Sequence, residues 1–133
     1  MKVFFAFFFG LAIVYSAHGA TSCENATTQG AMNECAAQSY RNADAELNRA
    51  YKTLTSQMKN DKESVRKLVV AQRAWIAFRD SECDLQSTQA KGGSVQGMVL
   101  NMCLEEQTRA RTKMLDAYMN CQEGDVSCRA RTR

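Results

Sequence analysis

The length, charge and composition of this chain limit its number of domains and the classes of function open to it. Its 133 residues suffice for one small domain, and a formal net charge of +3 gives no general case for binding nucleic acid or a membrane surface. The sequence contains no proline, so nothing of that kind interrupts long helices. It contains only one histidine, which excludes most catalytic sites that rely on this residue.

The first twenty residues, MKVFFAFFFGLAIVYSAHGA, predict a secretory signal peptide. Lys2 is the charged start, residues 3–14 are an apolar stretch too short for a stable membrane span, and Ala17 to Gly19 fit a cleavage site. Removing this segment takes away Lys2, His18 and five of the six phenylalanines, and leaves 16 basic and 14 acidic residues, a charge of +2. We therefore divide the chain into a signal peptide (1–20), a helical domain (21–120) and a basic C-terminal tail (121–133).

All cysteines lie in the exported part and predict three disulfides: Cys23, Cys35, Cys83, Cys103, Cys121 and Cys128. The sequence does not choose among the pairings, although Cys121 and Cys128 could close a local loop around Gly124. We expect a periplasmic or secreted protein. The residues ATSC, which end at Cys23, have alanine where a lipobox has leucine, so lipid anchoring is disfavoured.

Hydrophobic periodicity predicts three helices, from about Ala31 to Lys59, Lys62 to Ser87 and Ser94 to Asn120. Asp61 and Ser94 are the expected N-caps of the second and third. Because the connections are short, the predicted fold is all-α, a compact antiparallel three-helix bundle stapled by disulfides.

Several polar residues fall on the apolar stripes of these helices: Asp44, Asn48, Gln72, Arg79 and Arg111. Buried charges need partners, so we predict an internal polar network that fixes the helix register, for instance by pairing Asp44 with Arg79. Trp75, Phe78 and Tyr51 are expected in the core rather than on a ligand-binding surface.

Few catalytic options remain. The exported part has no histidine, which excludes Ser-His-Asp and Cys-His sites, and its oxidised cysteines supply no thiolate. Without histidine or a CxxC pair we expect no zinc site, and we expect no cofactor. Glu105–Glu106 or the group Asp80, Glu82 and Asp84 could serve as a glycosidase-type acid and base, but neighbouring acids on a helix usually face solvent in different directions. We therefore predict that the protein is not an enzyme.

The second predicted helix ends in acidic residues, where the helix dipole favours cations. An up-and-down bundle gathers acids at this pole: Glu24, Glu34, Asp80, Glu82, Asp84, Glu105 and Glu106. The opposite pole gathers bases: Lys52, Lys59, Lys62, Arg66, Lys67 and Lys113. Asp80, Glu82 and Asp84, with Lys91 and Ser94 of the expected flexible loop from Thr88 to Gly97, are therefore candidates for contact with a basic protein partner. The alternative is that these acids pair locally with Arg79, Arg109 or Lys91.

Short motifs along the chain carry a family resemblance. They are MNEC (Met32 to Cys35), ADAELNRAY (Ala43 to Tyr51), QRAWIAFRDSEC (Gln72 to Cys83), GGS (Gly92 to Ser94), and Cys103 followed by Thr108, Arg111 and Leu115. Together they make the chain similar to the LprI-type lysozyme-inhibitor-like family of exported bacterial proteins. The resemblance implies a disulfide-bonded helical domain, and its name implies inhibition of lysozyme. Cys121 and Cys128 look like an addition to a four-cysteine core.

The resemblance directs the functional expectation. Animal-type lysozymes are generally basic and hold carboxylates in a cleft. We expect the protein to bind a lysozyme, with a c-type lysozyme as the candidate partner, and to inhibit it by occluding that cleft. The loop from Thr88 to Gly97 would enter the cleft through Lys91 or Ser94. The alternative is a non-inhibitory envelope binding protein or immunity protein with another protein partner.

Overall fold

The computed structural model describes residues 23–122, 124–126 and 128, and the predicted signal peptide (1–20) lies outside them. Three long helices make up the fold: α1 (Gln29–Gln57), α2 (Lys62–Ser87) and α3 (Gln96–Met119). Two short 3-10 helices, η1 (Cys23–Asn25) and η2 (Thr88–Ala90), precede α1 and follow α2. No strand occurs in the described ranges, and the predicted all-α bundle is confirmed.

Two of the three long helices begin at an N-cap residue supplied by the local sequence, and the third does not. The side chain of Thr28 caps α1, and the Asp61 carboxylate accepts a hydrogen bond from the Ser64 amide at 3.0 Å, as predicted for α2. The prediction of Ser94 as the N-cap of α3 is wrong, because α3 begins after Val95 with no side-chain cap of its own. Asn33 of α1 holds this helix start instead, since its Oδ1 accepts from the Met98 amide at 3.2 Å and its Nδ2 donates to the Ser94 carbonyl at 2.9 Å.

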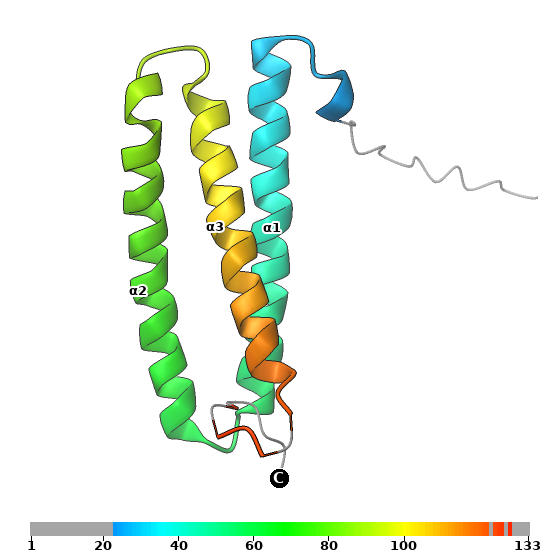
Figure 1. Ribbon diagram of the computed structural model, residues 1–133, viewed down its shortest axis with the longest axis vertical. Coiled ribbons are helices and arrows are strands. Elements are labelled where there is room, and N and C mark those ends of the chain that lie inside the picture. The colour runs from blue at the N-terminus through cyan, green and yellow to red at the C-terminus, as the bar shows by residue number, and fades with distance from the viewer. Residues whose placement is uncertain (1–22, 123, 127, 129–133) are drawn as a thin grey trace, which may run out of the picture.

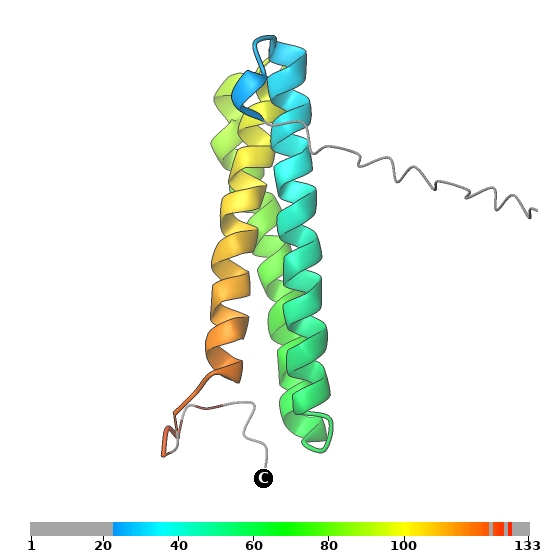
Figure 2. The same cartoon turned by 90° about the vertical axis from the view of Figure 1, so that its right-hand side faces the viewer.

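The three helices run alternately up and down, and α3 lies between α1 and α2 in Figure 1. α3 packs along α1 over much of its length and more lightly against α2, whereas α1 and α2 make few direct contacts beyond the turn that joins them. Figure 2 shows the long, narrow outline that results. Because α2 is covered mainly from one side, only a narrow stripe of it is buried.

The apolar core lies toward the end where α1 turns into α2. Its buried members are Leu47, Ala50, Leu54, Met58, Leu68 and Leu115. Tyr51, Val65, Trp75, Tyr118 and Met119 pack against them and are partly buried. Each fully buried large apolar side chain contributes about 1.5–3 kcal/mol of transfer free energy, so this cluster is the main stabilising unit of a small domain.

Trp75 and Tyr51 pack against the core as predicted, but the prediction for Phe78 is wrong. The Phe78 side chain is 54% exposed, and so are other large apolar residues of α2, with Val70 at 63% and Leu85 at 66%. The physical reason is the one-sided cover of α2. Its buried residues are Leu68, Arg79, Cys83 and Ser87, which face the other two helices, and the opposite face stays exposed in the described part of the chain.

The six cysteines form three disulfides, each between two cysteines that are consecutive in chain order. Cys23–Cys35 ties η1 to α1, Cys83–Cys103 ties the end of α2 to α3, and Cys121–Cys128 closes the expected loop, in which Gly124 has a φ of 89°. The described part of the chain contains no free cysteine. None of its helices has the length and hydropathy that crossing a bilayer requires.

Candidate functional site

Arg79 is a buried cation at the centre of a polar group that joins all three helices. Its side chain projects from the covered face of α2, and the residue is only 7% exposed. Its guanidinium lies 2.7 Å from the Asp80 carboxylate and 3.8 Å from that of Asp44 on α1, and it donates to the Thr108 hydroxyl of α3 at 3.5 Å. Two carboxylates therefore offset the cost of burying this charge.

Aromatic rings complete the surroundings of Arg79. The guanidinium carbon lies 5.5 Å from the centre of the Tyr40 ring and 5.2 Å from that of Trp75, distances typical of cation–π contacts. Burial raises the pKa of the Tyr40 hydroxyl, and the Arg79 charge partly offsets this rise. The Asn48 amide donates to Asp44 at 2.9 Å and holds that carboxylate in place.

The five candidate network residues thus form two groups rather than one. Asp44, Asn48 and Arg79 form the first. Gln72 and Arg111 form the second, in which Arg111 Nε donates to Gln72 Oε1 at 3.0 Å across α2 and α3. Trp75 lies near both arginines, because its ring centre is 5.9 Å from the guanidinium of Arg111. Both groups connect helices.

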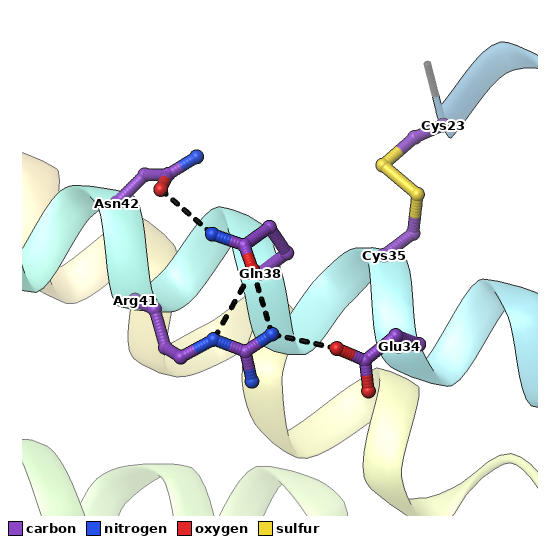
Figure 3. A network of polar contacts seen from close by, with 6 residues as sticks. All are labelled: Cys23, Glu34, Cys35, Gln38, Arg41 and Asn42. Atoms are coloured by element: carbon purple, nitrogen blue, oxygen red, sulfur yellow. Dashed lines mark hydrogen bonds and ion pairs between the residues drawn. A yellow bond between two sulfur atoms is a disulfide. The ribbon is translucent and has the colours of Figure 1, made fainter. Parts of the chain in front are cut away.

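The acidic residues separate into paired and unpaired ones. Figure 3 shows Glu34 facing Arg41 on α1, at 2.6 Å, close to the Cys23–Cys35 disulfide. Glu105 lies near the middle of α3 rather than at its start, 2.9 Å from Arg109, and this hydrogen bond raises the pKa of Arg109. Glu106, the next residue of α3, is exposed. The side chain of Glu24 is outside what the structure describes.

Glu82 and Asp84 are the acids of the last turns of α2 that have no ion pair among the described residues, and Glu106 on α3 likewise has none. Asp80 is held by Arg79, but in the described ranges neither Glu82 nor Asp84 forms an ion pair. Among the described residues, the side-chain hydrogen bond that Glu82 accepts comes from the neutral Gln86 amide, at 2.9 Å. Both carboxylates therefore keep their negative charge available at the C-terminal end of α2, where the helix dipole disfavours it.

Exposed apolar side chains lie beside these two acids. Phe78, Glu82 and Leu85 are spaced four and three residues apart, which places them on one face of α2, and Asp84 flanks them. We call these four residues the acidic–apolar end of α2. An exposed aromatic ring with a leucine and unpaired carboxylates is typical of a surface that binds another protein.

The sequence indicated the acids of this surface but not its apolar members. Helical periodicity predicts Phe78 in the core and does not single out Leu85, because it does not show which faces of a helix are covered. One feature of the sequence could have indicated exposed apolar residues. The second predicted helix has more apolar residues than a single buried stripe along a helix can accommodate.

The segment after α2 is more ordered than predicted. The expected open loop from Thr88 to Gly97 is shorter, because η2 takes Thr88–Ala90 and α3 takes Gln96 and Gly97. The Gly92 amide donates to the Gln96 side chain at 2.8 Å, and Gly92 adopts a φ of 77°, which glycine allows without strain. Lys91 and Ser94 are exposed beside the end of α2. No group of residues in the described ranges could hold a metal ion.

Comparison with known proteins places this chain among uncharacterised relatives. It is 41% identical over 112 residues to an uncharacterised protein of Rhizobium meliloti, an alignment that covers 76% of this chain and 81% of that protein. It is 31% identical over 105 residues to the uncharacterised protein YecT of Escherichia coli, covering 69% of this chain and 65% of YecT. No solved structure matches.

The family assignment rests on a match that covers most of the predicted mature domain. The family model described as "Lysozyme inhibitor LprI" matches residues 21–115, which contain α1, α2 and nearly all of α3. The Cys121–Cys128 loop lies beyond the matched range, in agreement with the resemblance drawn from the motifs. The chain therefore belongs to the LprI lysozyme inhibitor family.

Proposed function

We propose that the protein is exported and inhibits a lysozyme, with the acidic–apolar end of α2 as the surface that contacts the enzyme. The observation that carries this proposal is the exposure of Phe78 and Leu85 beside Glu82 and Asp84, two carboxylates without a cation partner in the described residues. The family description supplies the inhibitor class, which is not an enzyme class. Three disulfides agree with an oxidising compartment such as the periplasm.

The physical chemistry of this surface fits a basic enzyme. Two negative charges at a helix C-terminus cost about 0.3–1 kcal/mol each when exposed, and a cationic partner would remove that cost. Charge complementarity raises the rate of encounter, while an aromatic and a leucine side chain supply contact area once water is excluded. Lys91 and Ser94 lie at the same end and would meet the carboxylates of the enzyme's cleft.

The decisive measurement is the lysis of a peptidoglycan suspension by a c-type lysozyme, with the oxidised mature protein titrated in. We expect a stoichiometric loss of lysis that weakens as salt rises. The double charge reversal Glu82→Lys/Asp84→Lys should weaken inhibition at least about tenfold. The matched control Glu63→Lys/Asp116→Lys makes the same change in net charge at the opposite end of the bundle, in the first turn of α2 and the last turn of α3, and should inhibit normally.

Two outcomes would overturn the proposal. Unchanged inhibition and unchanged salt dependence in Glu82→Lys/Asp84→Lys would remove this surface from the mechanism. Lysis that persists at high excess of a protein shown to be helical and fully disulfide-bonded would reject inhibition of this lysozyme. The alternative, a non-inhibitory envelope binding or immunity protein, would then take its place, because the same exposed surface suits another basic protein.

A further inference from the structure

Among the described residues, two arginines are buried, and they have different partners. Arg79 has two carboxylates, whereas Arg111 is 8% exposed and has none within ion-pair distance in the described part of the chain. Arg111 donates through Nε to Gln72 and lies near the Trp75 ring, and its two terminal nitrogens have no acceptor among the described residues. A nearly buried cation is stabilised by an anion beside it, and the described residues supply none to Arg111. Its terminal nitrogens are not fully enclosed, so an anion from outside can reach them.

Arg111 also lines an open cleft, which gives the free edge of its guanidinium a place to meet a ligand. The cleft has a volume of about 410 Å³ and lies between the three helices, in the half of the molecule where α1 turns into α2. Its lining residues are Leu54, Met58, Ser64, Lys67, Leu68, Ala71, Arg111 and Tyr118. The volume falls in the range of small-molecule sites, roughly 300–1,000 Å³.

The chemistry of this lining defines the class of ligand. Leu54, Met58 and Leu68 are buried and give an apolar floor, while Arg111 contributes a nearly buried cation in one wall. Lys67 adds a second positive charge at the exposed rim, where Glu63 lies 2.9 Å from it. Among the described residues, no acidic side chain lines the cleft.

We propose that this cleft binds a small carboxylic acid with an apolar body. The ligand's carboxylate would take the terminal nitrogens of Arg111, in the way that Asp80 takes the guanidinium of Arg79, and its apolar part would cover Leu54, Met58 and Leu68. The site lies at the opposite end of the bundle from the acidic–apolar end of α2. It is therefore independent of the proposed inhibition of lysozyme.

The test uses octanoate as the probe and the oxidised mature protein. Trp75 is the only tryptophan and lies next to Arg111, so its fluorescence reports binding, and isothermal titration calorimetry measures it directly. We expect octanoate to bind at one site and octanamide, which has the same shape without the charge, to bind at least about tenfold more weakly. Arg111→Gln should weaken octanoate binding about tenfold, whereas the matched control Arg73→Gln, an exposed arginine of α2, should not.

A second variant tests the cleft without changing Arg111. Ala71→Trp fills the volume from an exposed position of the lining and should abolish octanoate binding while the helical circular dichroism is kept. The proposal is overturned if octanoate produces no heat and no fluorescence change at millimolar concentration. It is also overturned if octanamide binds equally well, or if Arg111→Gln, shown to be folded, keeps full affinity.

Discussion

At the scale of single residues, Arg79 shows how this small fold accommodates a buried charge. Its guanidinium is almost fully covered, whereas the side chains of its partners Asp44 and Asp80 are 42% and 56% exposed. The cation therefore depends on the carboxylates more than they depend on it, because each carboxylate can return to water and the guanidinium cannot.

This asymmetry predicts an order of stability among variants. Asp44→Ala/Asp80→Ala should lower the free energy of unfolding by about 2–3 kcal/mol, since it leaves a buried cation without an anion. Arg79→Met should cost only about 1 kcal/mol, because methionine fills similar space between the rings and both carboxylates become solvated. Urea unfolding followed by circular dichroism measures both values.

The control for this prediction is Glu82→Ala/Asp84→Ala, a pair of acids on the same helix without a buried cation beside them, which should change the unfolding free energy by less than about 0.5 kcal/mol. If Arg79→Met proved more destabilising than the double acid variant, the carboxylates would be the dependent partners and the interpretation of this group would be wrong.

The sequence predicted a contact between two residues only where helical periodicity placed both of them on the inward-facing side of their helices. The proximity of Asp44 and Arg79 follows because both fall on stripes that face the bundle axis. Phe78 could not be placed, since its exposure depends on α1 and α2 making few contacts, a property of the whole assembly. The same limit explains why Arg111 and Arg79, alike in the sequence pattern, have different partners.

At the scale of whole elements, the start of α2 depends on the charge of Asp61. Hydrogen bonds from the Ser64 side chain and amide lower the pKa of this carboxyl group, so the folded state favours its ionised form. The resulting stabilisation is present above the pKa of the unfolded chain, about 4, and is lost as pH falls through the lower folded-state pKa.

Asp61→Ala should therefore reduce stability at neutral pH, and the difference from the natural protein should shrink at about pH 2.5. Thermal unfolding at both pH values measures this difference. Asn60→Ala, a change at the exposed neighbouring residue, serves as the control and should show no such pH dependence. If the stability difference between Asp61→Ala and the natural protein were the same at both pH values, the ionised Asp61 carboxylate would not be what stabilises the start of α2.

The start of α3 illustrates a limit of local sequence rules. Ser94 has the residue type and position of an N-cap, yet Asn33, far away in the sequence, supplies the hydrogen bonds. A long-range cap of this kind leaves no local signature, so the sequence could predict that the helix exists and not what fixes its first turn.

The disulfides should contribute unequally, because only one joins two long helices. Cys83–Cys103 closes a separation of 20 residues between α2 and α3, and Cys83 is fully buried. Cys83→Ser/Cys103→Ser should lower the unfolding free energy by about 3 kcal/mol. Cys121→Ser/Cys128→Ser opens a loop after α3 and should change bundle unfolding by less than about 1 kcal/mol. Equal losses in guanidinium unfolding would show that the C-terminal loop is part of the cooperative unit.

At the scale of the whole molecule, charge is distributed along the bundle axis. Unpaired carboxylates lie at the end of α2, and exposed bases gather around the opposite turn, among them Lys59, Lys62 and Arg66. The sequence predicted this polarity from the alternation of helix directions. The alternative given with it, local pairing, is confirmed for Asp80 with Arg79 and for Glu105 with Arg109, and it leaves Glu82, Asp84 and Glu106 without an ion pair among the described residues.

If the acidic–apolar end of α2 binds lysozyme, its charged and apolar members should act on different rate constants. Glu82→Gln/Asp84→Gln should slow association and flatten its dependence on salt, because long-range attraction governs encounter. Phe78→Ala/Leu85→Ala should leave association nearly unchanged and speed dissociation roughly tenfold or more, because apolar contact forms only after docking. Surface plasmon resonance against a c-type lysozyme at several salt concentrations separates the two effects.

The structure supplies a matched control for this kinetic experiment. Val70 is as exposed as Leu85 and lies on the same helix, but it is far from the acids. Val70→Ala should therefore change neither rate constant. An effect of Val70→Ala as large as that of Phe78→Ala/Leu85→Ala would mean that the partner lies along the whole exposed face of α2. If Phe78→Ala/Leu85→Ala changed association alone, the proposed role of this surface would be wrong. Apolar side chains attract only at contact distance, so side chains that hold the complex together must affect dissociation.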